Sequence, residues 1–139
     1  MEAPKSKSDC AALRLGPLNV PLINRTLGAE LVPGELYLSK QAHWHIAQDH
    51  REDYAVCMLA LRRIGQSPGL IGQAPRHADN FELVIRFRSQ QAGHEYVLVA
   101  VGLEVDKSGL YRVKSAYRVP ERTITARRSS GHLHLPKHA

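Results

Sequence analysis

Cysteine is scarce in this chain of 139 residues, which contains only Cys10 and Cys57. The two do not form a Cys-x-x-Cys pair, so the spacing of a zinc finger is missing. Two cysteines are also far fewer than the dense framework of a small secreted domain. Cys57 lies among apolar residues in a helical pattern, where it should pack as a small hydrophobic side chain. We therefore expect no disulfide scaffold.

Long apolar runs are absent as well. No segment is long and apolar enough to span a membrane, and residues 1–9 lack the apolar core of a signal peptide. We expect no membrane partner and a protein of the cytoplasm, or one delivered into the cytoplasm of a target cell. The chain also lacks a Gly-x-Ser-x-Gly elbow, a phosphate-binding loop ending in Gly-Lys-Ser/Thr, and a Gly-x-Gly-x-x-Gly motif.

Acidic residues are outnumbered by basic ones, 13 to 19, and the net charge is +6. This balance indicates an anionic partner, which is nucleic acid, a phosphorylated ligand or an acidic protein. The carboxylates are scattered, and no pair of them marks a glycosidase or a two-metal nuclease. A carboxylate base, as in some metal-free ribonucleases, stays open.

The chain divides into a flexible leader (1–16), a single domain (17–133) and a frayed tail (134–139). Ser39 is suited to cap a helix from Lys40 to about His50, because its hydroxyl can accept from a first-turn N–H. A second helix begins near Asp53 and has apolar residues at spacings of three and four. Glu35–Leu38 indicates a short strand.

The second half of the chain changes to strand periodicity. Alternation from Phe81 indicates a half-buried strand. Tyr96 to Val105 is apolar on both faces and is predicted to be the central strand. Residues 106–109 form a hairpin turn. Helices first and an antiparallel meander afterwards predict an α+β fold, with N-terminal helices packed on one face of a roughly four-stranded antiparallel β-sheet.

The last predicted strand carries most of the charge, and Pro120 ends it. Strict alternation places one set of side chains on a buried face, which consists of Tyr111, Val113, Ser115, Tyr117 and Val119. The opposite, cationic face consists of Arg112, Lys114, Ala116 and Arg118. Arg122, Arg127 and Arg128 follow. This face is either a phosphate-binding surface or a solvated outer face whose charges protect a sheet edge.

Three histidines lie on the first helix, at positions 43, 45 and 50. Two histidines chelate a metal from a helix at a spacing of four, whereas these are separated by two, five and seven. We expect no metal and no cofactor. Each histidine alternatively satisfies local hydrogen bonds at the surface.

A metal-free reaction suits these residue types. Cleaving RNA requires a base for the 2′-hydroxyl, an acid for the 5′-oxygen, and cations for the charged phosphorane. Histidine titrates near working pH, and the arginine fork matches two phosphate oxygens. A hydroxyl such as Ser115 or Tyr117 can donate to a non-bridging oxygen, and tyrosine can stack on an unpaired base.

Two segments carry a resemblance. The first is Leu36-Tyr37-Leu38-Ser39 with His45-Ile46 and Asp49-His50-Arg51-Glu52. The second is Tyr111-Arg112-Val113-Lys114-Ser115-Ala116-Tyr117 with Arg127-Arg128 and Gly131. Together they resemble the phage-borne branch of the barnase, EndoU, colicin and RelE-like (BECR) nuclease superfamily, over roughly residues 35 to 133.

The resemblance implies metal-independent RNA cleavage, with His50, Ser115 and Arg127 as catalytic residues. The expected substrate-binding residues are His45, Arg112, Lys114, Tyr117, Arg118 and Arg128. RNA, such as tRNA, is the implied substrate, and an acidic immunity or antitoxin protein is the implied partner of a toxin. The alternative function is a non-catalytic basic module that binds nucleic acid or protein, or a degenerate nuclease fold kept as part of a virion.

Overall fold

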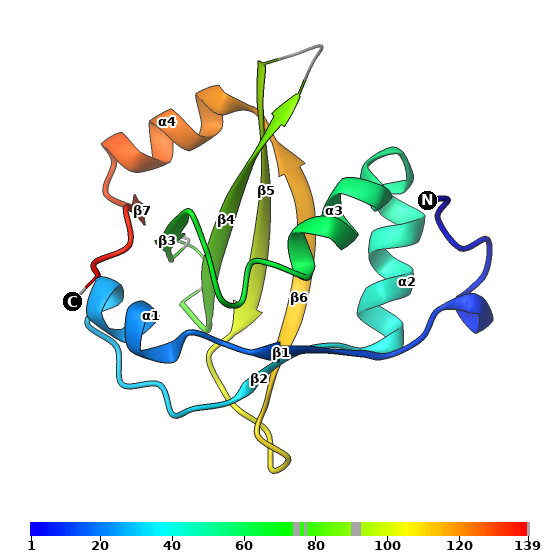
Figure 1. Ribbon diagram of the computed structural model, residues 1–139, viewed down its shortest axis with the longest axis horizontal. Helices are drawn as coiled ribbons and strands as arrows, with labels where there is room; N and C mark the ends of the chain where they lie inside the picture. Colours follow the sequence, from blue (N-terminus) through cyan, green and yellow to red (C-terminus); the bar gives the residue numbers. More distant parts are fainter. Residues whose placement is uncertain (74–75, 77, 90–92, 139) are drawn as a thin grey trace.

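A computed structural model describes residues 1–73, 76, 78–89 and 93–138 (Figure 1). The α-helices are α1 (Val20–Leu27), α2 (Lys40–Asp49), α3 (Tyr54–Leu61) and α4 (Glu121–Ser129), and the 3-10 helices are η1 (Lys7–Asp9) and η2 (Arg51–Asp53). The strands are β1 (Leu13–Pro17), β2 (Glu35–Leu38), β3 (Leu70–Gly72), β4 (Asn80–Ser89), β5 (Gly93–Gly102), β6 (Leu110–Val119) and β7 (Leu133–His134). They form one sheet in the order β1-β2-β6-β5-β4-β3-β7.

The α+β class is confirmed, but the four-stranded antiparallel sheet is wrong. The described part of the chain forms a mixed sheet of seven strands, in which β2 pairs parallel with β6. The additional strands β1, β3 and β7 have five residues or fewer. Strands β3 and β7 carry too few residues for a period of two to be recognised, and β1 lies in the segment that we assigned mainly to the leader.

The predicted packing of the N-terminal helices on one face of the sheet is confirmed, and α4 covers the other face, so both faces are buried. We name them by the helix that covers each. On the α3 face, Phe81, Leu83, Val97, Val99 and Val101 pack with residues of α1, α2 and α3. On the α4 face, Val84, Tyr96, Leu98 and Val119 pack with Ile124 of α4. Figure 1 shows α4 and α3 on opposite sides of β4 and β5.

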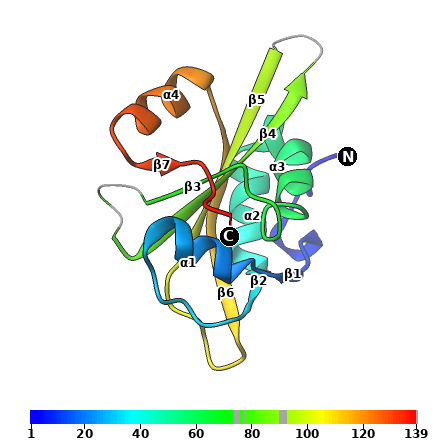
Figure 2. The ribbon, with the colours of Figure 1, turned by 60° about the vertical axis from the view of Figure 1, so that its left-hand side comes forward.

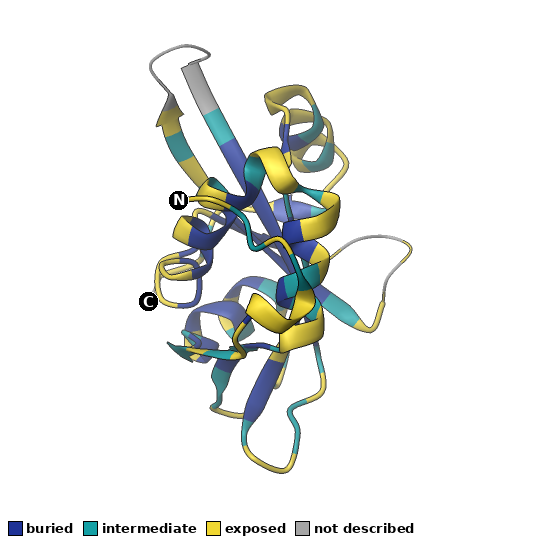
Figure 3. Cartoon of the chain, turned by 90° about the vertical axis from the view of Figure 1, so that its right-hand side faces the viewer, coloured by how far each residue is buried: buried dark blue, intermediate teal, exposed yellow. Residues whose placement is uncertain are grey.

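Strand β5 is the central strand, as predicted. It pairs with β4 on one side and β6 on the other. Val99 and Val101 have 0% exposure, because both faces of the strand are covered. Figure 3 shows the strands of the sheet buried and the outer helix surfaces exposed.

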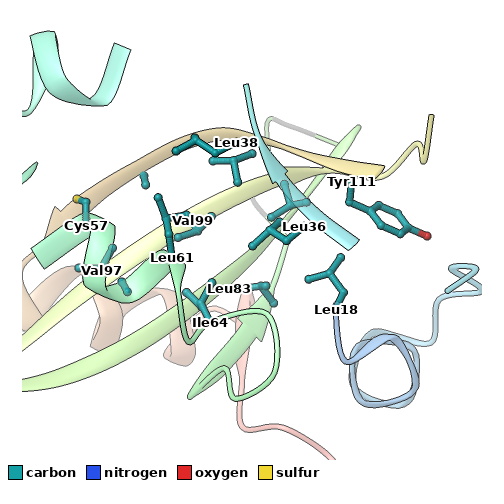
Figure 4. Close-up of a cluster of buried hydrophobic side chains, with 14 of the residues drawn as sticks. Leu18, Leu36, Leu38, Cys57, Leu61, Ile64, Leu83, Val97, Val99 and Tyr111 are labelled. Atoms are coloured by element: carbon teal, nitrogen blue, oxygen red, sulfur yellow. The ribbon is translucent and has the colours of Figure 1, made fainter. Parts of the chain in front are cut away.

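The larger core lies between the α3 face and the helices (Figure 4). Leu61 and Ile64 pack there with Leu36 and Leu38 of β2, and Cys57 is buried beside them. Burial raises the pKa of the Cys57 thiol to about 12, so this cysteine is a packing residue. Cys10 and Cys57 are both free thiols.

The predicted start of α2 is confirmed. The Ser39 hydroxyl accepts from the Ala42 N–H at 3.1 Å, which satisfies one N–H of the first turn. The helix ends at Asp49, and His50 is its C-cap residue. Asp53 precedes α3, although its side chain makes no capping hydrogen bond.

Both chain ends contact the domain. Residues 13–16, which we assigned to the leader, belong to β1, and the Arg51 guanidinium donates to the carbonyl oxygens of Ala3 and Pro4. In the predicted tail, the Lys137 N–H donates to the Thr26 hydroxyl at 2.9 Å. Figure 2 shows this end beside α1. Residues of the predicted leader and of the predicted tail therefore make hydrogen bonds with the domain.

Helices that are long and apolar enough to cross a membrane are absent from the described residues.

The burial of β5 generates a prediction. Val101→Asp should lower the free energy of unfolding by more than about 3 kcal/mol, because it places an unpaired charge in the core. Val32→Asp, at an exposed valine, is the matched control and should change it by less than about 0.5 kcal/mol. Urea denaturation measures both. Equal effects of the two substitutions would contradict the architecture.

Candidate active site

A β-bulge divides strand β6. Ala100 of β5 pairs with Ser115, whereas the next residue, Val101, pairs with Val113. Lys114 is therefore an extra residue in the ladder, and the alternation shifts by one position after it. Tyr111, Val113 and Ala116 pack on the α3 face, while Tyr117 and Val119 pack on the α4 face. The predicted single alternation over residues 111–119 is wrong beyond Val113 for this reason.

The bulge changes the neighbours of the charged side chains. Arg112 and Lys114 precede the shift, so they share the α4 face with Ser115 and Tyr117, which follow it. The Cε atom of Lys114 lies 3.0 Å from the position that a Cβ atom on Gly102 would occupy. Glycine at position 102 therefore gives the lysine stem room on this face. Strict alternation would place the cations Arg112 and Lys114 on one face and the hydroxyls of Ser115 and Tyr117 on the other. The bulge places all four on the α4 face.

The cross-strand register aligns further residues with these. Glu82 of β4 pairs with Ala100, which pairs with Ser115. In the next row, Val84 pairs with Leu98, which pairs with Tyr117. Residues directly opposite in neighbouring strands share a face of the sheet. Glu82 and Ser115 thus flank the small side chain of Ala100.

Helix α4 contributes an arginine to this group. Nη2 of Arg127 donates to Oε1 of Glu82. Glu82 is only 4% exposed, and the Arg127 side chain is largely buried. A buried carboxylate requires such a partner, because removing an unpaired charge from water costs several kcal/mol. The ion pair therefore holds Arg127 over the row that contains Ser115.

Tyr117 lies in the electric field of this ion pair. Burial raises the pKa of its phenol, the negative charge of Glu82 raises it further, and the positive charge of Arg127 partly opposes them. The phenol therefore stays protonated well above neutral pH. In that state Tyr117 can donate a hydrogen bond to an anionic oxygen.

His50 reaches the same tyrosine from the end of α2. Its ring stacks on the Tyr117 ring, with the centroids 5.8 Å apart and the planes 28° from parallel. Strand β2 covers the edge of β6 at Leu110–Arg112, and α2, which follows β2, runs beside the remaining part of β6 (Figure 1). This arrangement brings His50, Ser115, Tyr117 and Arg127, all predicted site residues, to one region.

Three predicted substrate-binding residues contact carboxylates outside this group. Arg118 lies on the opposite side of β6, where it contacts Asp53 at 3.5 Å and Glu95 at 3.2 Å. His45 is exposed and contacts Asp49 at 3.0 Å. Arg112 shares the α4 face but contacts Asp106 at 3.4 Å. Arg128 lines a separate pocket beside α4.

His43 has a structural role. It is buried, with Nδ1 2.8 Å from the Ala11 carbonyl oxygen and Nε2 2.6 Å from the Tyr54 hydroxyl. Both ring nitrogens are used within the fold. No group of three histidine, cysteine, aspartate or glutamate side chains is placed to hold a metal ion in the part of the chain that the structure describes.

Glu82 is the residue of this group that the sequence did not single out. It stands in an alternating strand at a position assigned to the exposed face. The available signal is its neighbour on that face, Val84, which is apolar and indicates a covered surface. A carboxylate on a covered face requires a cation, and α4 provides one.

Comparison of the chain with protein-family models, curated proteins and solved structures finds no match.

The buried ion pair generates a double-mutant prediction. Glu82→Leu and Arg127→Met should each destabilise the protein by about 3 kcal/mol, since each leaves one charge buried without its partner. The double variant should be more stable than the sum of the two predicts, with a coupling energy above about 1 kcal/mol. The exposed pair Arg14–Glu35 is the matched control, and its coupling should stay below about 1 kcal/mol. Urea denaturation of both sets measures this, and additive effects at Glu82 and Arg127 would disprove the pairing.

Proposed function

We propose that the protein is a metal-independent ribonuclease whose active site lies on the α4 face at β6. The contact between His50 and Tyr117 carries this proposal. It joins a histidine, the side chain most often used for proton transfer, to a face that holds two hydroxyls and an ion-paired arginine. Proton transfer and phosphate binding require these groups within reach of one another.

The reaction uses the chain's own side chains. The 2′-oxygen of the RNA attacks the adjacent phosphorus and its proton passes to a base. The bond from phosphorus to the 5′-oxygen breaks, and an acid protonates the leaving oxygen. The products are a 2′,3′-cyclic phosphate and a 5′-hydroxyl. His50 is our candidate acid, and Glu82 is our candidate base for the first proton.

Hydrogen-bond donors of Arg127, Tyr117 and Ser115 stabilise the charged phosphorane. Arg127 contacts Glu82 through one nitrogen, and its fork has further N–H groups for a phosphate oxygen. Tyr117 and Ser115 supply hydroxyl donors. Because Glu82 orients the guanidinium before substrate binds, the donors need little reorganisation during the reaction.

A non-catalytic RNA-binding module is the second candidate. The charge of Arg127 is already opposed by Glu82, which weakens its attraction for a phosphate. Arg112 and Lys114 continue the cationic surface toward the start of β6, and either function would use them to follow the RNA backbone. The resemblance adds a toxin role to the proposal, with an acidic immunity protein as the partner of this surface.

One experiment separates the two candidates. Total tRNA is incubated with the protein in EDTA, and the ends of any fragments are analysed. The ribonuclease proposal predicts fragments that end in 2′,3′-cyclic phosphate, with the same rate when Mg²⁺ replaces EDTA. Binding of tRNA without cleavage would reject the enzyme and support the binding module.

Binding itself should depend on salt. If Arg112, Lys114 and Arg127 contact phosphates, the logarithm of the binding constant for single-stranded RNA should fall with the logarithm of salt concentration, with a slope of about −0.7 for each contact. Lys114→Ala should make the slope shallower by about that amount. Fluorescence anisotropy of a labelled oligonucleotide measures it. An affinity independent of salt would rule out RNA as the ligand.

The acid role of His50 generates a kinetic prediction. His50→Ala should lower the single-turnover cleavage rate by roughly 10²–10⁴-fold, the usual contribution of one acid–base group. His45→Ala is the matched control, because it removes an exposed histidine of the same helix and should leave the rate unchanged.

The thermal midpoint is measured on the same variants. His50 caps the end of α2, and its N–H donates to the Ile46 carbonyl oxygen through the backbone, which alanine retains. A midpoint near that of the unmodified protein with a lost rate supports catalysis. A lowered midpoint with an unchanged rate would assign His50 a structural role alone.

A further inference from the structure

A pocket of about 410 Å³ lies beside α4, apart from the residues of the proposed active site. Its volume falls in the range of small-ligand sites. The floor is apolar and two arginines stand among its lining residues. The apolar and aromatic lining residues are Leu70, Val84, Tyr96, Ile124 and Leu135, and the arginines are Arg86 and Arg128.

The pocket lies where α4 makes little apolar contact with the sheet. Ile124 is the buried residue of this helix, and β3 beneath it has three residues. The space between the helix, β4 and the chain around Leu135 is therefore left unfilled. Leu135, which lines this space, is 60% exposed.

The charges of this pocket favour an anion. Arg86 and Arg128 make no ion pair with the carboxylates of the described residues. The Tyr96 hydroxyl donates to Glu121 at 3.5 Å, so this carboxylate contacts the tyrosine of the pocket. A ligand that fits has a flat or apolar part for the floor and an anionic group for the guanidinium forks.

We propose that this pocket is a nucleotide subsite, in which the floor and Tyr96 bind the base while Arg86 and Arg128 bind the phosphate. The inference rests on the proposed ribonuclease function and deepens it. Tyrosine rings and arginine planes are the usual partners of unstacked bases in single-stranded RNA. The subsite would hold a nucleotide next to the one that is cleaved.

The geometry of α4 supports this relation. Consecutive helix residues point about 100° apart, so Arg127 reaches Glu82 while Arg128 faces the pocket. Val84, which lines the pocket, stands in one row with Leu98 and Tyr117. Neighbouring strands are about 4.8 Å apart, which separates Val84 from Tyr117 by roughly 10 Å. One oligonucleotide can therefore occupy both places.

The test measures binding of small molecules that do not undergo cleavage. The four nucleoside 5′-monophosphates, the four nucleosides and inorganic phosphate are titrated separately, and affinity is followed by NMR chemical shifts. At least one monophosphate should bind about tenfold more tightly than its nucleoside and than phosphate. Arg128→Ala should remove most of that advantage.

Arg122→Ala is the matched control, because it removes an exposed arginine of the same helix that does not line the pocket. It should leave nucleotide affinity unchanged. Tyr96→Leu keeps an apolar side chain and should weaken monophosphates and nucleosides alike, whereas Arg128→Ala weakens only the phosphorylated ligands.

Equal affinity for phosphate and monophosphates would overturn the subsite, as would equal effects of Arg128→Ala and Arg122→Ala. The result is separable from the ribonuclease proposal. Cleavage of tRNA without nucleotide binding here would keep the enzyme and reject the subsite. Nucleotide binding without cleavage would keep the pocket as a ligand site and reject the enzyme.

Discussion

The extra residue in β6 is the constraint on which the proposed site depends. Hydrogen bonding in a sheet normally forces side chains to alternate, and Lys114 breaks this rule at one point. Before the bulge, Tyr111 and Val113 fill the core on the α3 face. After it, the small Ala116 takes the place beneath the helices, so Tyr117 is directed to the α4 face. Without the shift, Ser115 and Tyr117 would compete for space in an apolar core.

Helix α4 completes this face by two contacts of different kinds. Ile124 supplies the apolar contact, and the pair of Arg127 with Glu82 supplies the polar one. A buried ion pair adds little net stability, but its geometry is specific. The orientation of α4 therefore depends on Glu82, and this orientation presents consecutive arginines to two separate places. The placement of both arginines therefore depends on one carboxylate.

The sequence predicted those parts of the fold that depend on local pattern. The alternation in β4, the doubly apolar β5 and the Ser39 cap are all contained within about ten residues. The bulge, the parallel pairing of β2 with β6 and the docking of α4 depend on contacts between distant segments. Helix α4 was missed because its polar sequence lacks an apolar period. The candidate residues His50, Ser115, Tyr117 and Arg127 were predicted individually, whereas their proximity and the position of Glu82 required the three-dimensional structure.

A structure with a bound substrate analogue tests the central claim most directly. An RNA oligonucleotide with 2′-deoxy substitution at the scissile nucleotide lacks the attacking hydroxyl and should bind without reacting. We expect a phosphate within hydrogen-bond distance of Arg127 and of the Tyr117 hydroxyl, with the His50 ring facing the 5′-oxygen. An oligonucleotide bound on the outer surface of helices α2 and α3, with no phosphate at Arg127, would contradict the proposed active site.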